Sequence, residues 1–284
     1  MRGWIGLWSG IVSTSATTPR ELGRRIRQSA LRMVHKAGAS HIGSCLSAAD
    51  ILAVLYGRVL RIDPARPDWP NRDRFILSKG HAAAALYAAL AERGFFPCER
   101  LATYCENGSE LTGHVNHAVP GVEVSTGSLG HGLPIGCGMA LAAKRGGLGW
   151  RTFVLLSDGE CDEGSTWEAA LFAPHHKLDN LVAIVDYNKI QSFGSVKDVL
   201  DLAPLADKWR AFRWEVHEVD GHDHREIEEA LRAAAAAAGR PTAVIAHTVK
   251  GKGVSYMEDK LTWHYKSPDD GQLDQAIREL GEEP

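Results

Sequence analysis

Long apolar runs and a strong charge of one sign are both missing from this 284-residue sequence. No uninterrupted apolar stretch approaches the roughly 20 residues that a membrane-spanning helix needs, so we expect no membrane partner. The formal net charge is only −3, which argues against nucleic acid as the main partner. What remains is ordinary globular composition, with 44% hydrophobic and 24% charged residues, in a chain long enough to bury a sizeable core.

Cysteines are few and irregularly spaced. There are five, an odd number with no CxxC pair, so neither a disulfide framework nor a cysteine metal site is expected. This usage favours a reducing compartment, and we predict a cytoplasmic protein. No internal repeat or low-complexity linker divides the chain, so we expect one domain over residues 20–284. Residues 1–19 are interpreted as a disordered or docking extension, or an over-long start.

Short apolar runs rich in β-formers alternate with helical patterns along the chain. Buried strands are predicted at residues 74–77, 152–156, 181–186, 214–219 and 242–247. Helices are predicted at residues 20–37, 47–60, 133–144, 167–176, 204–212, 225–238 and 269–283, and in an alanine-rich stretch that ends at Gly94. Ser47 is expected to be the N-cap of the second helix. This alternation predicts an α/β fold, a doubly wound parallel sheet with helices on both faces.

Two predicted strands end at side chains that suit a metal ion. Asp158 and Gly159 come just after the strand at 152–156, and Asn188 comes just after the strand at 181–186. Open α/β sheets bind ligands outside the carboxyl ends of their strands. Mg²⁺ prefers oxygen ligands and is usually completed by phosphate oxygens and water, and Gly159 lets a diphosphate approach the backbone. The alternative is an ordinary βαβ turn with a capping Asp.

The segments around these residues resemble the transketolases, a branch of the thiamine-diphosphate-dependent enzymes. An Asp-Gly pair after one strand, followed by Asn after the next, is similar to the thiamine-diphosphate motif, and EGSTWEA, LDNLVAIVDYN and KIQ resemble transketolase segments. The resemblance implies thiamine diphosphate with Mg²⁺ (or Ca²⁺ or Mn²⁺) as cofactors. The metal ligands would be the side chains of Asp158 and Asn188 and the carbonyl of Ile190, with Gly159 at the diphosphate. Ser157 departs from the family, which usually has Gly there.

Several histidines also lie in segments that resemble transketolases, in matching order: SHIGSCLS, LSKGHA, ELTGH, EVSTGSLGHG and TVKGKG…WH. By that resemblance His41, His81, His114 and His264 line the substrate channel. An imidazole titrates near neutral pH, so it can donate to a sugar hydroxyl or move a proton. For any one of them, the alternative is a hydrogen-bonded surface histidine.

Other positions carry weaker implications. The resemblance places Gly127 and Leu129 at the diphosphate and aminopyrimidine region of the cofactor, and His131 where the family usually has Gln. Glu163 resembles the family Glu that faces the partner chain's catalytic Glu, although a first-turn helix carboxylate favoured by the helix dipole is the alternative. The pairs His175-His176 and His222-x-His224 lack a third ligand for zinc, so surface or cap roles are expected for them.

The resemblance reaches only the diphosphate-binding half of the family. Transketolases that work alone are much longer, and their second half supplies a pyrimidine-binding domain with the Glu that protonates the pyrimidine ring. The resemblance therefore implies the N-terminal subunit of a split transketolase, completed by a separate C-terminal subunit in an α2β2 assembly. Its substrates would be small sugars, with a two-carbon ketol unit moving from a ketose to an aldose. The alternatives are a biosynthetic carbon–carbon ligase, the α subunit of a 2-oxo acid dehydrogenase, and a non-catalytic cofactor-binding subunit.

Overall fold

The computed structural model describes residues 17–281, and a five-stranded sheet runs through its centre. The strands are β1 (Arg74–Leu77), β2 (Thr152–Ser157), β3 (Leu181–Tyr187), β4 (Glu215–Asp220) and β5 (Thr242–His247). They lie in the order β1-β2-β3-β5-β4, and every neighbouring pair is parallel. Because all strands run the same way, their carboxyl ends meet along one edge of the sheet.

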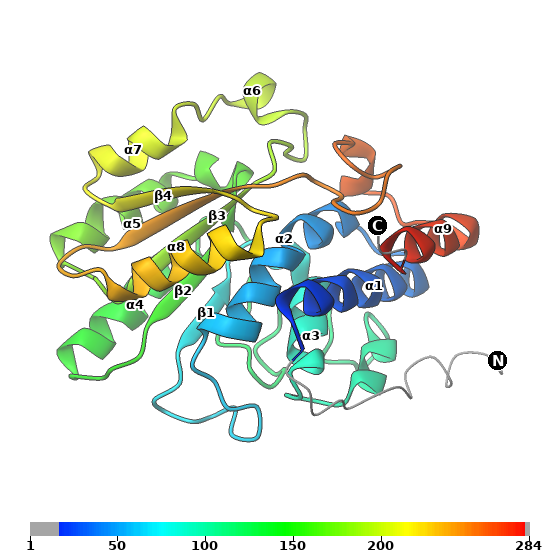
Figure 1. Ribbon diagram of the computed structural model, residues 1–284, viewed down its shortest axis with the longest axis horizontal. Helices are drawn as coiled ribbons and strands as arrows, with labels where there is room; N and C mark the ends of the chain where they lie inside the picture. Colours follow the sequence, from blue (N-terminus) through cyan, green and yellow to red (C-terminus); the bar gives the residue numbers. More distant parts are fainter. Residues whose placement is uncertain (1–16, 282–284) are drawn as a thin grey trace.

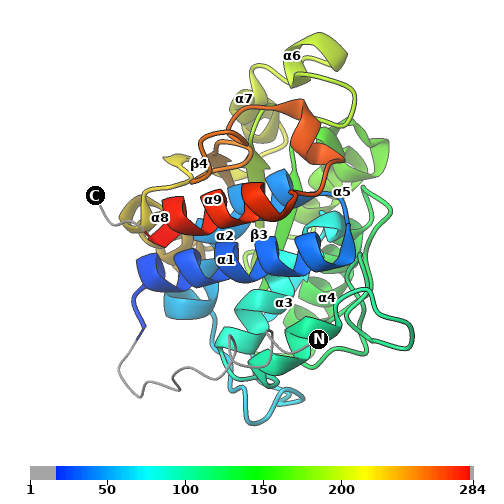
Figure 2. The same ribbon diagram turned by 90° about the vertical axis from the view of Figure 1, so that its right-hand side faces the viewer.

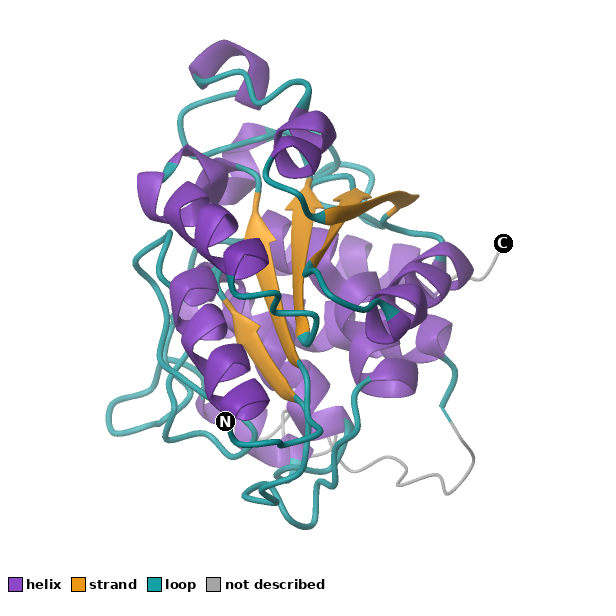
Figure 3. Ribbon diagram, turned by 90° about the vertical axis from the view of Figure 1, so that its left-hand side faces the viewer, coloured by secondary structure: helices purple, strands orange, loops and turns teal. Residues whose placement is uncertain are grey.

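Nine α-helices of the described chain surround this sheet. They are α1 (Pro19–Ala37), α2 (Ile42–Val54), α3 (Ala83–Glu92), α4 (Gly132–Arg145), α5 (Gly164–His175), α6 (Val196–Val199), α7 (Leu205–Ala211), α8 (His224–Ala236) and α9 (Asp270–Gly281). Short 3-10 segments cover Gly80–Ala82, Cys98–Thr103, Gly159–Asp162 and Leu261–His264. Figure 3 shows the sheet between the layers of helices. The predicted α/β class with a parallel sheet is confirmed.

Alternate side chains of each strand enter two separate cores. In β2, Phe153 and Leu155 join the core formed with α1, α2, α3, α8 and α9. Val154 and Leu156 join the core formed with α4, α5 and α7. A strand buried on both faces reads as a continuous apolar run, which is why β2, β3 and β5 were visible in the sequence, whereas the edge strand β4 has only Val219 buried.

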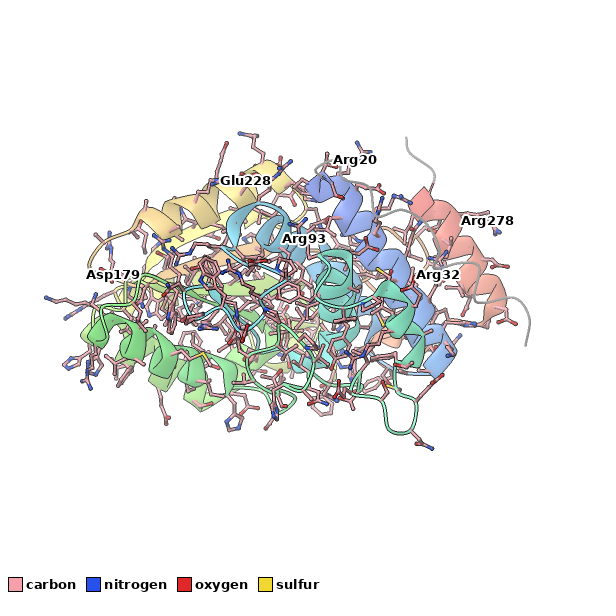
Figure 4. The ribbon with its side chains drawn as sticks, turned by 90° about the horizontal axis from the view of Figure 1, so that it is seen from below. Arg20, Arg32, Arg93, Asp179, Glu228 and Arg278 are labelled. Carbon is pink, nitrogen blue, oxygen red and sulfur yellow. The ribbon has the colours of Figure 1, made fainter. Side chains whose placement is uncertain are left out.

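Helices α1 and α9 close one side of the molecule, although they are far apart in the sequence. They lie next to each other (Figures 1 and 2), and Ser267, just before α9, donates a hydrogen bond to the carbonyl of Val34 on α1 at 3.1 Å. Arg32 and Arg278 mark this end of the molecule in Figure 4, and Asp179, before β3, marks the other.

The predicted start of the second helix is wrong. The helix begins at Ile42, not at Ser47, and continues through a π-helical turn at Leu55–Val59. All 13 residues of α2 are buried, so no polar face marks its register in the sequence. Ser47 is not an N-cap, and its hydroxyl donates instead to Oδ2 of Asp186 at 2.6 Å.

The same buried helix is apolar enough to resemble a membrane span. Residues 42–59 pass a test of length and composition, but 83% of this 18-residue window is buried inside the protein, as expected for a core helix. Other predicted elements match the structure to within a few residues, and α6 adds one helical turn within the segment 191–201. The expectations for residues 1–16 and for the last three residues lie outside the described part of the chain.

Candidate active site

A cavity of about 210 Å³ opens at the carboxyl edge of the sheet. Each of its walls comes from a strand end or from a loop that crosses that edge. Ten of the eleven predicted site residues line it, and Glu163 is the exception. The spatial convergence of residues as distant in sequence as His41 and His264 follows from the parallel topology.

Asp158, Asn188 and Ile190 all line this cavity and each carries an oxygen that could bind a metal ion. The two carboxylate oxygens of Asp158 accept hydrogen bonds from the backbone nitrogens of Gly159 at 2.8 Å and Lys189 at 2.5 Å. The Asn188 side-chain oxygen accepts from the Ile190 nitrogen at 3.2 Å, which leaves a second lone pair open. These contacts fix the orientation of the Asp158 and Asn188 side chains.

The charge of Asp158 is poorly compensated. The side chain is only 2% exposed, and burial together with the nearby Asp186 carboxylate raises its pKa. Within residues 17–281, no side-chain cation forms an ion pair with it. A buried carboxylate beside a carbonyl and an amide oxygen is the donor set that Mg²⁺ or Ca²⁺ prefers, so the residues present fit a divalent ion.

A buried ion pair lies beneath these oxygens. Lys79, after β1, contacts the carboxylate of Asp186 on β3, and both side chains are fully buried. Ser47 and Thr248 donate to the same carboxylate. Burial would raise the pKa of Asp186, but the Lys79 ammonium and these donors hold it below its usual range. The Asp186 carboxylate therefore stays ionised, and the pair with its donors joins α2, the end of β1, β3 and the end of β5.

Four imidazoles line the same cavity and lie close together, as an imidazole wall. The ring of His41 lies 5.1 Å from that of His81, 5.9 Å from that of His114 and 4.9 Å from that of His264, centroid to centroid. His41 adopts a left-handed backbone conformation, with φ of 74°, and its amide nitrogen donates to the His264 carbonyl at 2.9 Å. The loop before α2 and the segment after β5 are thereby held together.

Three of these imidazoles are neutral at physiological pH. Burial, aided by neighbouring cations, lowers the pKa of His41 to about 4 and that of His264 to about 3, and lowers that of His81 well below its usual value. Nδ1 of His41 is buried, with no hydrogen-bond partner in the described chain. An unpaired buried nitrogen is costly, and this one has less than 1 Å² of accessible surface, so it is closed to a ligand in this conformation.

Lys250 is a cavity residue that the sequence analysis did not select. Its ammonium nitrogen lies 2.9 Å from the carbonyl oxygen of Ile190 and 2.8 Å from Nδ1 of His264. Because an ammonium can only donate, Nδ1 of His264 accepts and the ring proton is on Nε2. Burial and the charge of Lys79 lower the pKa of Lys250. A lysine that closely follows the carboxyl end of a parallel strand was the available sequence signal.

The glycine-rich loop, residues 123–132, also lines the cavity and is anchored by Glu160. This fully buried carboxylate accepts from the Gly130 nitrogen at 2.9 Å and from the Ser157 nitrogen at 3.3 Å, and it also accepts from the Ser78 hydroxyl. Gly127 and Leu129 consequently face the cavity. Glu160 was also missed, because nothing in its local sequence distinguishes it from a first-turn helix carboxylate.

Glu163 and His131 lie away from the cavity lining. Glu163 is exposed at the N-cap of α5 and makes no side-chain capping hydrogen bond. It packs behind the glycine-rich loop, since a Cβ at Gly130 would approach the Cβ of Glu163 to 2.7 Å. His131 is exposed at the N-cap of α4. The described chain alone therefore gives Glu163 no catalytic contact.

Comparison with known proteins identifies the family. Residues 19–284 match the family model described as "Transketolase, thiamine diphosphate binding domain". The chain belongs to the transketolase family. The family predicted from the sequence is confirmed, and with it thiamine diphosphate as the cofactor that defines the domain.

Two transketolase relatives match along nearly their whole lengths. An apulose-4-phosphate transketolase subunit of Phocaeicola vulgatus is 44% identical over 256 residues, which cover 90% of this chain and 91% of the relative. A 6-deoxy-6-sulfo-D-fructose transketolase subunit of a Clostridium species is 44% identical over 259 residues, covering 91% and 94%. Both relatives are named as subunits.

Solved transketolases share the fold but are much longer. The enzyme from Leishmania mexicana superposes with a TM-score of 0.88 at 30% identity, covering 94% of this chain and 42% of that one. The enzyme from Campylobacter jejuni gives 0.87 at 33% identity, covering 93% and 42%. This chain thus spans less than half of the length of these transketolases.

Proposed function

We propose that this chain is the N-terminal subunit of a two-subunit transketolase, which transfers a two-carbon ketol unit from a ketose to an aldose acceptor. The observation that carries the proposal is that Asp158, Asn188 and Ile190 line the same cavity as the four imidazoles. Relatives of the same length that are named as transketolase subunits support it. They give no support to a 2-oxo acid dehydrogenase or a non-catalytic role.

The cavity would hold a divalent ion and the diphosphate of the cofactor. Asp158, Asn188 and the carbonyl of Ile190 would bind Mg²⁺ (or Ca²⁺ or Mn²⁺), while Gly159 leaves room at the backbone for the diphosphate. The Lys250 ammonium would add positive charge beside it. When bound, thiamine diphosphate supplies the electron sink for carbon–carbon cleavage and ligation. Gly127 and Leu129 would contact the cofactor from the glycine-rich loop.

The imidazoles would handle the hydroxyl groups and protons of the sugar. Neutral His41 lines the cavity and can accept a hydroxyl proton on its ring, and His264 can donate from Nε2 because Nδ1 is engaged by Lys250. His81 and His114 complete the wall of donors and acceptors. The rings lie 4.9 to 6.0 Å apart, centroid to centroid, so several hydroxyl groups of one sugar could each meet a different imidazole.

A second polypeptide would complete the cavity. Phe193 is 83% exposed and Tyr265 is 57% exposed, and they sit at the rim because their neighbours Ser192 and His264 line the cavity. The Tyr265 hydroxyl donates to the Ser192 carbonyl at 3.2 Å, so both rings belong to one edge. We infer that a C-terminal subunit with the pyrimidine-binding domain covers this rim and meets Glu163, in an α2β2 assembly.

The substrate class and the location follow from the same proposal. The relatives are named for apulose 4-phosphate and for 6-deoxy-6-sulfofructose, so a specialised phosphorylated or sulfonated ketose is as suitable a donor as a common one. The five free cysteines fit a reducing compartment, which supports the cytoplasm. The domain would extend from about residue 20 to residue 284, with the first 19 residues as an extension.

The test combines binding with turnover. Thiamine diphosphate binding is measured by calorimetry with Mg²⁺ and with excess chelator, for the chain alone and with a C-terminal transketolase subunit. Activity is then assayed on a panel of ketoses and 2-oxo acids. We expect metal-dependent binding and ketol transfer only in the two-subunit complex. Substantial ketol transfer by the purified chain alone would contradict the split enzyme, and acyl transfer to lipoamide would instead indicate the dehydrogenase class.

A further inference from the structure

The imidazole of His222 uses both of its nitrogens inside the protein. Nδ1 lies 2.8 Å from Oδ2 of Asp50 on α2, and Nε2 lies 2.9 Å from the backbone nitrogen of Val249. An amide nitrogen can only donate, so Nε2 accepts and the ring proton is on Nδ1, where it is donated to Asp50. The side chain is only 12% exposed. The surface or cap role expected for His222 is therefore wrong.

Asp50 gives this ring a fixed anchor. The Arg27 guanidinium on α1 donates to both carboxylate oxygens, at 2.9 and 2.5 Å. Burial would raise the pKa of Asp50, but Arg27 and two imidazoles hold it well below its usual range. The carboxylate is thus an ionised acceptor tied to two helices. A ring flip of His222 would cost it both hydrogen bonds, so Nε2 is aimed permanently at Val249.

The segment that His222 holds leads directly into the cavity. Val249 precedes Lys250, whose ammonium contacts Ile190 and His264. On the other side the turn at Gly221 packs so closely that a Cβ there would lie 2.3 Å from Cγ2 of Thr248. The β4–α8 turn and the segment after β5 therefore fit against each other, with the imidazole as their polar link.

We propose that His222 is a positioning residue that fixes the backbone at Val249 and thereby sets where Lys250 presents its ammonium to the cofactor diphosphate. The inference rests on the proposed function, because the cofactor diphosphate is a ligand of the cavity only if the chain is a transketolase subunit. His222 itself touches no ligand; it acts through one backbone N–H and one side chain.

His224 provides a matched control. It lies on the same turn and donates from Nε2 to the same carboxylate, at 2.9 Å from Oδ1 of Asp50. Across residues 17–281, no hydrogen bond joins its side chain to the segment 248–250. If cofactor binding were weakened only because Asp50 had lost a hydrogen-bond donor, variants of both histidines would show the same weakening.

The experiment compares three full-length variants in the two-subunit complex. His222→Asn keeps a donor near Nδ1 but loses the acceptor at Nε2, His222→Gln places an oxygen near Nε2, and His224→Asn is the control. We expect His222→Asn to raise the Kd for thiamine diphosphate with Mg²⁺ about tenfold, as for the loss of one buried acceptor. The other two variants should stay within about threefold of the wild type. Equal effects of the two Asn variants, or no effect of His222→Asn, would overturn the proposal.

Two measurements on the isolated chain do not depend on cofactor. Hydrogen exchange of the Val249 amide should be about tenfold faster in His222→Asn than in His224→Asn. In the wild type, imidazole nitrogen shifts should show His222 as the neutral Nδ1–H tautomer, which needs no variant to fold. An Nε2–H tautomer of His222, or equal hydrogen exchange of the Val249 amide in both variants, would overturn the proposal. Failure of the wild-type complex to bind thiamine diphosphate would instead refute the proposed function.

Discussion

The ammonium nitrogen of Lys250 lies 2.9 Å from the carbonyl oxygen of Ile190, the backbone oxygen that we propose as a metal ligand. A carbonyl oxygen has two lone pairs, so it can face the lysine and a divalent ion together. The same ammonium is bonded to His264. Lys250 thus connects the proposed metal ligands to the imidazole wall. Its loss should weaken the arrangement of both.

The first prediction concerns this lysine. Lys250→Met should raise the Kd for thiamine diphosphate about 10- to 100-fold, because a hydrogen bond to a charged group is worth about 1.5–3 kcal/mol. Calorimetry of the two-subunit complex measures the change. The matched control is Lys252→Met: the Lys252 side chain is 38% exposed and lies 3.8 Å from Glu258, and its variant should bind as the wild type does. If Lys250→Met and Lys252→Met weakened cofactor binding equally, Lys250 would contribute only through its general positive charge.

Much of the metal side of the cavity was predictable, for a physical reason. Asp158 and Asn188 follow strands whose residues are buried on both faces, so each strand stands out as an apolar run with a polar residue at its end. Parallel strands end at one edge, and this brings the two residues together without knowledge of side-chain packing. The histidines were found only through resemblance, since their loops have no periodicity.

The residues missed by sequence reasoning depend on long-range partners. Asp186 reads as the end of an apolar strand, and its partner Lys79 is 107 residues away. Likewise, His222 gains its role from Asp50, 172 residues earlier. The start of α2 was misplaced because a helix buried on every side has no amphipathic pattern to fix its ends. In each case the information lies in tertiary packing rather than in local sequence.

The second prediction concerns the buried pair of Lys79 and Asp186. Lys79→Met should lower the free energy of unfolding by about 3–5 kcal/mol, because it leaves a buried carboxylate without its counterion. The double variant Lys79→Met/Asp186→Asn should be less destabilised than the sum of the two single variants. Urea unfolding measures each value.

The exposed pair of Lys144 and Asp179 provides the control for that series. These side chains are 37% and 31% exposed and lie 2.6 Å apart, so Lys144→Met should cost less than about 1 kcal/mol. If Lys79→Met cost no more than Lys144→Met, the pair beneath the cavity would not be the structural anchor that its burial indicates.

The third prediction tests the departure from the family at Ser157. The Ser157 hydroxyl accepts from the Glu160 nitrogen at 3.3 Å, and Glu160 in turn accepts from the Ser157 nitrogen. Ser157→Gly removes one of these reciprocal bonds and adds backbone freedom, so it should lower the free energy of unfolding by about 1 kcal/mol. Ser157→Ala, which removes only the hydroxyl, separates the two contributions. Thermal unfolding that shows no loss in either variant would mean that the hydroxyl does not stabilise this turn.

The fourth prediction follows from the imidazole wall. Burial is the main cause of the lowered pKa values of His41 (about 4), His81 and His264 (about 3). In the unfolded chain these rings titrate near their ordinary pKa of about 6.5. Below that pH the unfolded state binds protons that the folded state refuses, so stability rises with pH in this window and falls as the pH is lowered from about 6.5 towards 4. Urea unfolding between about pH 7.5 and pH 5 measures the slope.

A variant shows whether the imidazole wall is the source of that slope. His81→Asn removes one of the three buried rings, so its stability should depend less steeply on pH than that of the wild type, whatever its stability at neutral pH. The comparison uses the slope because the substitution also changes packing, and packing shifts every point of the curve alike. Identical slopes in the two proteins would mean that the acid sensitivity comes from elsewhere in the chain, and that His81 is not held neutral by its surroundings.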